Sequence, residues 1–95
     1  MDSLVSGGAI VSGGRVERCI LGPEVRVNSY AKVIDSVLMD GVDVGRYARV
    51  TKAIVDKGVR IPANFVVGED ADDDQKRFTV TPAGVVVIPR EARLD

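Results

Sequence analysis

Two stretches of this chain hold residues that could bind an ion. The chain opens with a glycine phrase, LVSGGA over residues 4–9, followed at once by its near copy IVSGGR over residues 10–15. Free backbone N–H groups of such glycines could cradle a phosphate, but a phosphate loop also needs a following Lys-Ser or Lys-Thr and a helix, and neither follows. The acidic run Asp72-Asp73-Asp74 could attract a cation. It lacks the glycine-bearing spacing of a calcium loop, so we expect it to face solvent.

The residues that usually carry catalysis are nearly missing. The chain has no histidine and one cysteine, Cys19. A cysteine nucleophile needs a neighbouring base, and the sequence offers none beside Cys19, so we expect a small buried or half-buried side chain. One cysteine also forms no internal disulfide.

Size and charge narrow the function classes. The chain has 95 residues and a net charge of −1, which indicates one small domain without a bulk field for nucleic acid or for a membrane surface. There is no signal-peptide pattern and no long apolar run, so a cytoplasmic protein is expected. Eighteen residues are valine and only 4% are aromatic, a composition that suits strands around a narrow aliphatic core.

A seventeen-residue repeat organises the first two thirds of the chain. Rows begin at residues 10, 27, 44 and 61, and three columns are aliphatic throughout. These columns are Ile10, Val27, Val44, Ile61; Val16, Val33, Val50, Val67; and Leu4, Leu21, Leu38, Val55. Anchors six, five and six residues apart predict three short strands per turn, and they match no helical stripe. We therefore predict an all-β fold, a parallel β-helix of about four coils over residues 4–68, with strands of successive coils about 4.8 Å apart.

The remainder is expected to close the stack. Residues 69–77 are predicted to form an acidic, solvated loop, and residues 78–95 to form C-terminal strands and a tail. The apolar runs around Pro82-Ala83-Gly84 predict a hairpin or paired strand that covers the open edge of the last coil. REARLD is predicted to be a short helix or a frayed end. The first coil has no comparable cap, so we expect that a further segment precedes it.

The repeat also stacks outward charges in columns. Arg18, Asp35, Lys52 and Arg26, Asp43, Arg60 alternate in sign, which predicts cross-strand pairs. Arg15, Lys32 and Arg49 form an all-basic column, which would need a bound anion or an acidic partner surface, unless the side chains simply splay into solvent. Tyr30 and Tyr47 also stack at an outward corner, where paired exposed tyrosines favour a subunit contact.

The repeat is of the hexapeptide type, whose β-helices are left-handed by resemblance. Acyltransferases of this type use a histidine base and its carbonic anhydrases bind zinc through three histidines, so the absence of histidine argues against both. Non-repetitive phrases give a more specific resemblance. SLVSGGAIVSGG, RVNSYAKVIDSVLMDGVDVGRYARV, IVDKGVRIP and RFTVTPAGVVVIPRE closely resemble the C-terminal domain of bacterial glucose-1-phosphate adenylyltransferase.

This resemblance implies a function for the parent enzyme. The family joins ATP and glucose 1-phosphate, with Mg²⁺, into ADP-glucose and pyrophosphate for glycogen synthesis. That chemistry belongs to an N-terminal nucleotidyltransferase domain, and nothing in this sequence resembles its glycine-rich loop or metal-binding aspartates. We therefore expect no catalytic centre and no cofactor in this chain.

The resemblance also implies a site. The β-helix domain of the family supports a homotetramer and, together with its own catalytic domain, binds a phosphorylated metabolite effector. Lys57 in VDKGV and Arg90 in IPRE match basic positions implicated in effector binding. A second tail arginine of the family motif matches either Arg93 or Leu94. The alternative is a stand-alone assembly or scaffold module without ligand, whose basic residues meet acidic patches on partner subunits.

Overall fold

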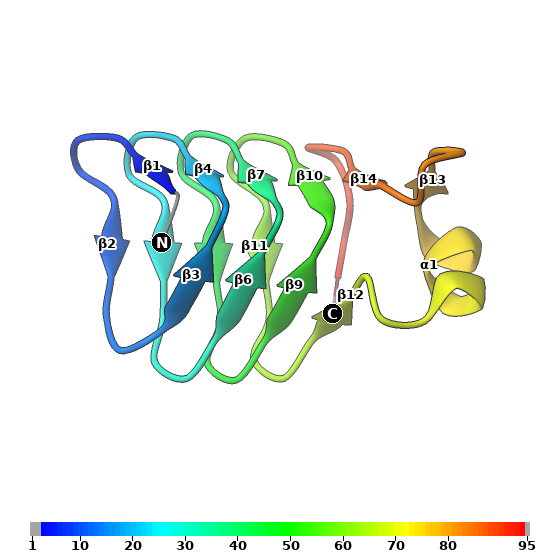
Figure 1. Ribbon diagram of the computed structural model, residues 1–95, viewed down its shortest axis with the longest axis horizontal. Coiled ribbons are helices and arrows are strands. Elements are labelled where there is room, and N and C mark those ends of the chain that lie inside the picture. Colours follow the sequence, from blue (N-terminus) through cyan, green and yellow to red (C-terminus); the bar gives the residue numbers. More distant parts are fainter. Residues whose placement is uncertain (1–2, 95) are drawn as a thin grey trace.

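The computed structural model describes residues 3–94 as a stack of coils with one short strand per side (Figure 1). The strands of successive coils form three sheets, here called A, B and C. Sheet A contains, in spatial order, β1 (Leu4–Val5), β4 (Ile20–Leu21), β7 (Val37–Leu38), β10 (Ala53–Val55), β14 (Val86–Ile88) and β13 (Thr79–Val80). Sheet B contains β2 (Ile10–Val11), β5 (Arg26–Val27), β8 (Asp43–Val44) and β11 (Arg60–Ile61). Sheet C contains β3 (Arg15–Glu17), β6 (Lys32–Ile34), β9 (Arg49–Thr51) and β12 (Val66–Val67).

All neighbouring strands pair in parallel except β13, which is antiparallel to β14. The fold is a left-handed parallel β-helix of about four coils, which confirms the predicted fold class. The predicted C-terminal hairpin is also confirmed, because β13 and β14 pair with each other and β14 continues sheet A beside β10.

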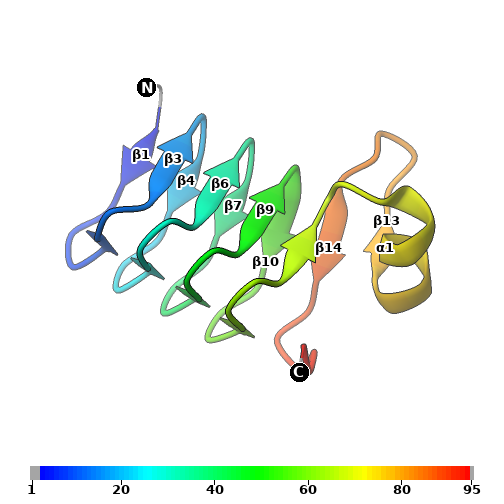
Figure 2. The same cartoon turned by 90° about the horizontal axis from the view of Figure 1, so that it is seen from below.

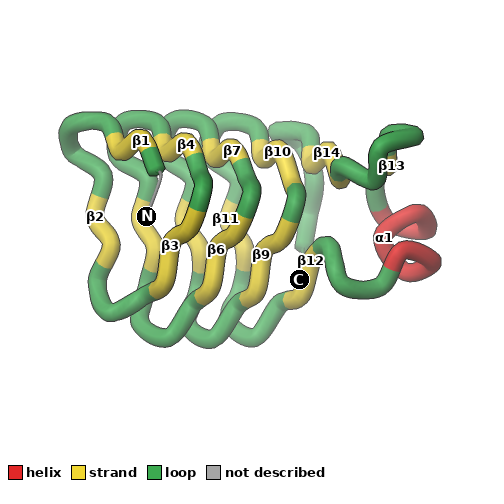
Figure 3. The backbone as a smooth tube through the Cα atoms, in the orientation of Figure 1, coloured by secondary structure: helices red, strands yellow, loops and turns green. Residues whose placement is uncertain are grey.

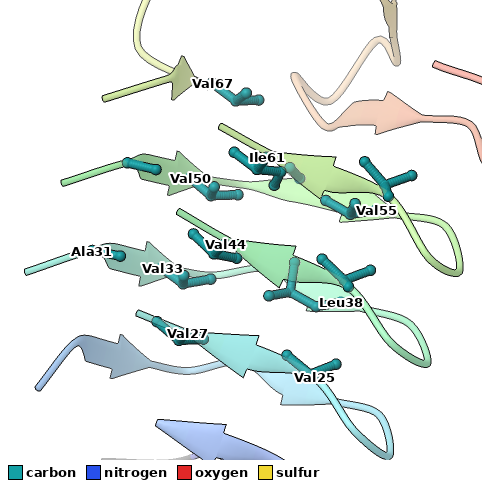
Figure 4. Close-up of a cluster of buried hydrophobic side chains, with 14 of the residues drawn as sticks. Val25, Val27, Ala31, Val33, Leu38, Val44, Val50, Val55, Ile61 and Val67 are labelled. Carbon is teal, nitrogen blue, oxygen red and sulfur yellow. The ribbon is translucent and has the colours of Figure 1, made fainter. Parts of the chain in front are cut away.

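The core is the set of inward columns that the repeat predicted. Figure 4 shows Val27, Val44 and Ile61 one above the other, and these three side chains are at most 2% exposed. The second column, Val33, Val50 and Val67, is fully buried beside them. Each fully buried valine or leucine contributes about 1.5–3 kcal/mol of transfer free energy, so the narrow interior is stabilised mainly by these stacked aliphatic side chains.

The first coil departs from the predicted register by one residue. Val5 pairs with Leu21, and Val11 pairs with Val27, so the inward columns begin at Val5 and Val11 rather than at Leu4 and Ile10. The assignment of Leu4 and Ile10 to the inward columns was therefore wrong. The cause is a shorter corner: four residues separate Val11 from Val16, where five separate Val27 from Val33.

A glycine makes the short corner fit. A Cβ added to Gly14 would lie 2.8 Å from Cγ1 of Val27 and 3.0 Å from the Asn28 carbonyl oxygen, so the corner approaches the next coil more closely than a side chain allows. The corners between sheets B and C all use left-handed backbone, with φ of 76° at Gly13 in the first corner, 63° at Tyr30 and at Tyr47, and 66° at Asn64.

Residues 69–77 were predicted to be a loop, and this was wrong. Residues Ala71–Arg77 form helix α1 at the far end of the stack from the N-terminal coil (Figure 3). Asp70 caps the helix, because its side chain accepts a hydrogen bond from the Asp73 N–H. Carboxylates in the first turn and Lys76 and Arg77 in the last turn complement the helix dipole.

The acidic run does not face solvent along its whole length. Asp74 is 3% exposed, and its carboxylate accepts a hydrogen bond of 3.0 Å from the Gly68 N–H, where the chain leaves the coils. Burial raises the pKa of the Asp74 carboxyl, although the hydrogen bond from Gly68 opposes this. The prediction of a solvent-facing run was thus wrong at Asp74, which ties α1 to the last coil.

After this excursion the chain resumes the stack. Twenty residues separate Val67 from Ile88, where four separate Val50 from Val55, so the corner between sheets C and A contains a sixteen-residue insertion. Figure 2 shows β14 taking the next place in the row of coils. The described part of the tail, up to Leu94, contains turns rather than the helix that REARLD allowed, and Leu94 is buried against the core.

Candidate functional site

Lys57 and Arg90 lie on neighbouring coils at the same corner. Val55 pairs with Ile88, and the Asp56 N–H donates a 3.0 Å hydrogen bond to the Ile88 carbonyl oxygen. Lys57 and Arg90 each follow their strand by two residues, so the two turns run side by side. Both side chains are exposed. The structure therefore brings together two residues that are thirty-three positions apart in the sequence.

The insertion is what creates this juxtaposition. Because the chain leaves at Gly68 and returns at β14, residues 86–94 rebuild two sides of a fifth coil above residues 53–61. The Ala92 N–H bonds to the Pro89 carbonyl oxygen at 3.0 Å, as the Val59 N–H bonds to the Asp56 carbonyl oxygen one coil below. The same turn geometry thus repeats on both coils, and it fixes where the two basic side chains begin.

Two further arginines lie next along the chain from these turns. Arg60 and Arg93 line a hollow of about 290 Å³ together with Pro62, Ala92 and Leu94. Arg93 is exposed and Leu94 is 7% exposed, so of the two matches for the second tail arginine, Arg93 is the one that presents a cation. Sequence reasoning placed Arg60 in a structural column and missed it here. Arg60 precedes Arg93 by thirty-three positions, as Lys57 precedes Arg90, and this shared spacing is the sequence signal that would have pointed to Arg60.

Few carboxylates compete for these cations. Arg90 lies 3.8 Å from Glu91, and both side chains are largely exposed, so this pair is weak. The Asp56 carboxylate accepts a 2.7 Å hydrogen bond from the Lys57 backbone N–H, which orients the turn and leaves the Lys57 ammonium exposed. The corner therefore holds exposed cations on a backbone fixed by parallel pairing, an arrangement suited to binding phosphate or carboxylate oxygens.

Comparison with known families identifies the family to which this fold belongs. A family model described as GlmU-like, C-terminal hexapeptide matches residues 1–88. The chain belongs to this hexapeptide family.

Several similar proteins are glucose-1-phosphate adenylyltransferases. The one from Anaeromyxobacter sp. is 53% identical over 94 residues, which are 99% of this chain and 23% of the relative. The one from Methylococcus capsulatus is 49% identical over 93% of this chain and 21% of its own length, and the one from Bifidobacterium longum is 52% identical over 99% and 23%. The hexapeptide domain thus spans less than a quarter of these relatives and corresponds to their C-terminal region, as the sequence resemblance indicated.

A larger hollow of about 590 Å³ lies at the end of the stack, beside the insertion. Phe65, Phe78 and Arg77 line one side of it, and tail residues 89 and 91–94 line the other. The Arg77 guanidinium carbon lies 4.6 Å from the Phe65 ring centre and 5.7 Å from the Phe78 ring centre, and the guanidinium also pairs with Asp73. Arg77 therefore packs the insertion onto the last coil, and we assign it a structural role.

The basic column is in register as predicted. Arg15 pairs with Lys32, and Lys32 with Arg49, on sheet C. Its outer members already hold carboxylates, because Arg15 bonds to Glu17 and Arg49 makes two hydrogen bonds to Glu69, of 2.8 and 3.0 Å. These pairs remove much of the like-charge repulsion. The binding of an anion or an acidic partner to this column stays a prediction. Because Glu17 and Glu69 offset part of its positive charge, the column attracts such a ligand less strongly than three unpaired cations would.

The two alternating columns behave differently. Arg18 bonds to Asp35 at 2.6 Å, and this hydrogen bond lowers the pKa of the Asp35 carboxyl, while Lys52 donates instead to the Ala83 carbonyl oxygen at 2.7 Å. Arg26, Asp43 and Arg60 are in register, but within residues 3–94 no ion pair joins them. Asp43 accepts a 2.8 Å hydrogen bond from Asn28 instead.

The tyrosines stack as the repeat predicted. Their ring centres lie 5.0 Å apart with an interplanar angle of 14°, and Tyr30 is 64% and Tyr47 53% exposed. Cys19 is 2% exposed, as expected for a small buried residue, and burial raises the pKa of its thiol. Among residues 3–94, no group of three or more His, Cys, Asp and Glu side chains is arranged to hold a metal ion, and the helix that they contain cannot span a membrane.

Proposed function

We propose that this hexapeptide domain is the regulatory and assembly part of a glucose-1-phosphate adenylyltransferase. In this proposal the parent enzyme converts ATP and glucose 1-phosphate into ADP-glucose and pyrophosphate for glycogen synthesis, in the cytoplasm. The nucleotide chemistry, with its Mg²⁺ and ATP, belongs to the parent's own catalytic domain. The hexapeptide domain contributes contacts within a homotetramer and part of a site for a phosphorylated metabolite effector.

The observation that carries the proposal is the corner shared by Lys57 and Arg90. Their turns are adjacent on paired strands, and Arg60 and Arg93 follow on the same two coils. A phosphorylated metabolite presents several anionic oxygens at once, and cations that start from one fixed backbone lose less entropy on binding than cations on separate flexible loops. The effector site would lie where this corner meets the catalytic domain of the parent.

Titration of the isolated domain with anions tests the site directly. Amide spectra would be recorded while inorganic phosphate, and separately a hexose bisphosphate, is added. We expect the largest shifts in the turns at residues 56–60 and 89–93, and tighter binding of the bisphosphate because it engages more than one cation. Lys57→Glu and Arg90→Glu should each weaken binding at least about tenfold, since each replaces an attractive charge by a repulsive one.

Lys76→Glu is the matched control. Lys76 is also an exposed cation but lies in α1, so its reversal changes net charge equally and should leave binding within about twofold. In a full-length adenylyltransferase carrying this domain, Lys57→Glu should abolish effector activation and leave the tetramer intact. If Lys76→Glu weakens binding as much as Lys57→Glu does, the anions bind through the net charge of the domain and not at this corner. Loss of the tetramer would favour the stand-alone assembly module instead.

A further inference from the structure

The corners between sheets B and C carry a short ladder of aromatic rings. Tyr30 lies between β5 and β6, and Tyr47 lies one coil further along, between β8 and β9. Their rings are nearly parallel, with centres 5.0 Å apart, and Tyr30 is the more exposed of the two. One face of the Tyr30 ring therefore packs on Tyr47, and the other face is turned toward the first coil.

The first coil has no side chain to cover this second ring face. Its own corner contains Gly13 and Gly14. The Tyr30 N–H donates a 3.1 Å hydrogen bond to the Gly13 carbonyl oxygen, as the Tyr47 N–H donates to Ser29, so the corners stack directly. Rings stack favourably with centres about 4.5–7 Å apart, a range that includes the coil spacing of about 4.8 Å. We call the space beside the two glycines, facing the Tyr30 ring, the open step.

Basic side chains lie beside the open step. Ala31 is buried between Tyr30 and Lys32, so these two side chains leave the chain on the outward side. Arg15 pairs with Lys32 in sheet C and belongs to the same coil as the open step. Arg15 bonds to Glu17, but Lys32 forms no ion pair within residues 3–94. A cation without a counter-ion thus lies two residues from the free ring face, at most about 7 Å along the chain.

We propose that the open step binds a purine nucleotide, with the base stacked on Tyr30 and the phosphate paired with Lys32. The base supplies a flat ring for the ladder, and the phosphate supplies the anion that Lys32 lacks. This site is separate from the effector corner, because Lys57 and Arg90 follow strands of sheet A at the other end of the stack. The inference goes beyond the proposed function and does not depend on it.

The ring and the cation together select this class of ligand. A neutral sugar or an aromatic side chain would cover the ring but leave Lys32 between two arginines without a counter-ion. A sugar phosphate would neutralise the cation but leave the ring face uncovered. A nucleic acid strand needs successive stacking platforms and a basic groove, whereas one ring face is open here and the net charge is −1. A single nucleotide meets both requirements.

Proton NMR tests the stack directly, because the chain has two tyrosines and no tryptophan. Inosine monophosphate is the probe, inosine is the base without phosphate, and ribose 5-phosphate is the phosphate without base. We expect the monophosphate to shift the Tyr30 ring protons upfield through the ring current of the base. Inosine should give the same shift with at least about tenfold weaker binding, because it lacks the charged contact. Ribose 5-phosphate should leave the Tyr30 ring protons unshifted.

Four variants assign the contacts. Tyr30→Leu removes the ring but keeps an apolar side chain, so it should weaken binding of the monophosphate at least about tenfold. Tyr47→Leu is its matched control, since Tyr47 does not face the open step, and binding should stay within about threefold of the wild type. Lys32→Gln should weaken the monophosphate about tenfold and leave inosine unchanged. Lys76→Gln, in α1, should change neither, and circular dichroism would verify that every variant is folded.

The outcomes keep this inference apart from the proposed function. If the monophosphate shifts only residues 56–60 and 89–93, it binds at the effector corner and the open step is overturned. The inference also fails if Tyr30→Leu binds as tightly as the wild type, or if Tyr47→Leu loses as much affinity. If no probe shifts either tyrosine, the inference fails and the ladder is left to a subunit contact. Failure of the effector corner would instead appear in Lys57→Glu and Arg90→Glu, with the tyrosine shifts unchanged.

Discussion

The coils and the corner of residues 68–85, which contains the sixteen-residue insertion, are stabilised by contacts of different kinds. In the coils, each buried side chain lies above and below similar side chains, so the same contact is made several times over. In the insertion, individual contacts hold each part: Asp74 accepts from Gly68, Arg77 packs against Phe65 and Phe78, and Lys52 holds the Ala83 carbonyl.

This difference predicts how each region tolerates change. A defect in one coil leaves the same kind of contact intact in the other coils, whereas a defect in the insertion removes a contact that is made only once. The proposed effector corner belongs to both regions, because Lys57 lies on a coil and Arg90 follows the insertion. Damage to the insertion should therefore displace Arg90 from Lys57 even where the coils remain folded.

The largest effect is expected at Gly68, where the chain leaves the coils. Gly68 has φ of 91°, and a Cβ there would overlap the Thr51 carbonyl oxygen. Gly68→Ala must therefore shift backbone as well as adopt a strained conformation, and we expect a loss of about 3 kcal/mol or more, measured by urea unfolding. Gly58→Ala is the control, because its φ of 70° is also positive but nothing lies within 4 Å of the added Cβ. Equal losses in both variants would mean that backbone strain alone, and not the crowded exit, decides.

The second prediction compares two coils at one column. Val5 and Val55 both point inward from sheet A, but Val5 is 51% exposed on the first coil and Val55 is fully buried. Val55→Ala should cost about 2 kcal/mol through lost burial and a residual cavity, and Val5→Ala less than about 0.5 kcal/mol. Similar losses would show that the first coil is covered in solution, contrary to its exposure here.

The third prediction concerns the carboxylate that anchors α1. Asp74→Ala should cost about 1–2 kcal/mol, because the Gly68 N–H loses its acceptor. Asp74→Asn keeps an oxygen acceptor and removes a buried charge. Since burial raises the Asp74 pKa in the folded state, the unfolded chain loses this proton first as pH rises. The wild type should therefore lose stability relative to Asp74→Asn as pH rises from about 4, the ordinary aspartate value, through the raised folded value.

Asp35 lies on the coils, and its pKa is shifted in the opposite direction to the pKa of Asp74. Its hydrogen bond from Arg18 lowers its pKa in the folded state, so its contribution is present above the ordinary value and is lost as pH falls through the lowered one. Unfolding of Asp35→Asn and Asp74→Asn against the wild type, across one pH series, should give difference curves of opposite slope. If the two difference curves have the same slope, the direction of the pKa shift is wrong for either Asp35 or Asp74.

The sequence predicted the coils better than their boundaries, for physical reasons. The inward column of sheet B was predictable from Val27 onward, because the other residue of each strand there is charged: Arg26, Asp43 and Arg60. In the first coil both Leu4 and Val5, and both Ile10 and Val11, are aliphatic, so pattern alone does not choose between registers. The choice depends on a corner shortened by one residue at Gly14, a tertiary fit that no periodicity reports.

The insertion could be predicted only in part. Asp70 followed by acidic and then basic residues is a helix signature, but the run is short and strongly charged, which is also typical of a solvated loop. The burial of Asp74 depends on where α1 docks, which local sequence does not specify. At the candidate site, the resemblance supplied Lys57 and Arg90 and left Arg93 and Leu94 as alternatives for a third position, but Arg60 needed the coil count after the insertion.

The smallest effect is expected at the stacked tyrosines on the coil corner. Tyr30 and Tyr47 both have φ of 63°, a conformation that costs an alanine about 1 kcal/mol more than a glycine, and their stacking contributes about 0.5–1.5 kcal/mol. Tyr47→Ala should therefore destabilise the domain by about 1 kcal/mol, whereas in Tyr47→Gly the relieved backbone offsets the lost stacking, to within about 0.5 kcal/mol of the wild type. Thermal unfolding of both variants would measure this. If alanine and glycine cost the same, the rings rather than the backbone set the stability of the corner. If neither variant loses stability but both weaken subunit association, the tyrosines are kept for a partner rather than for the fold.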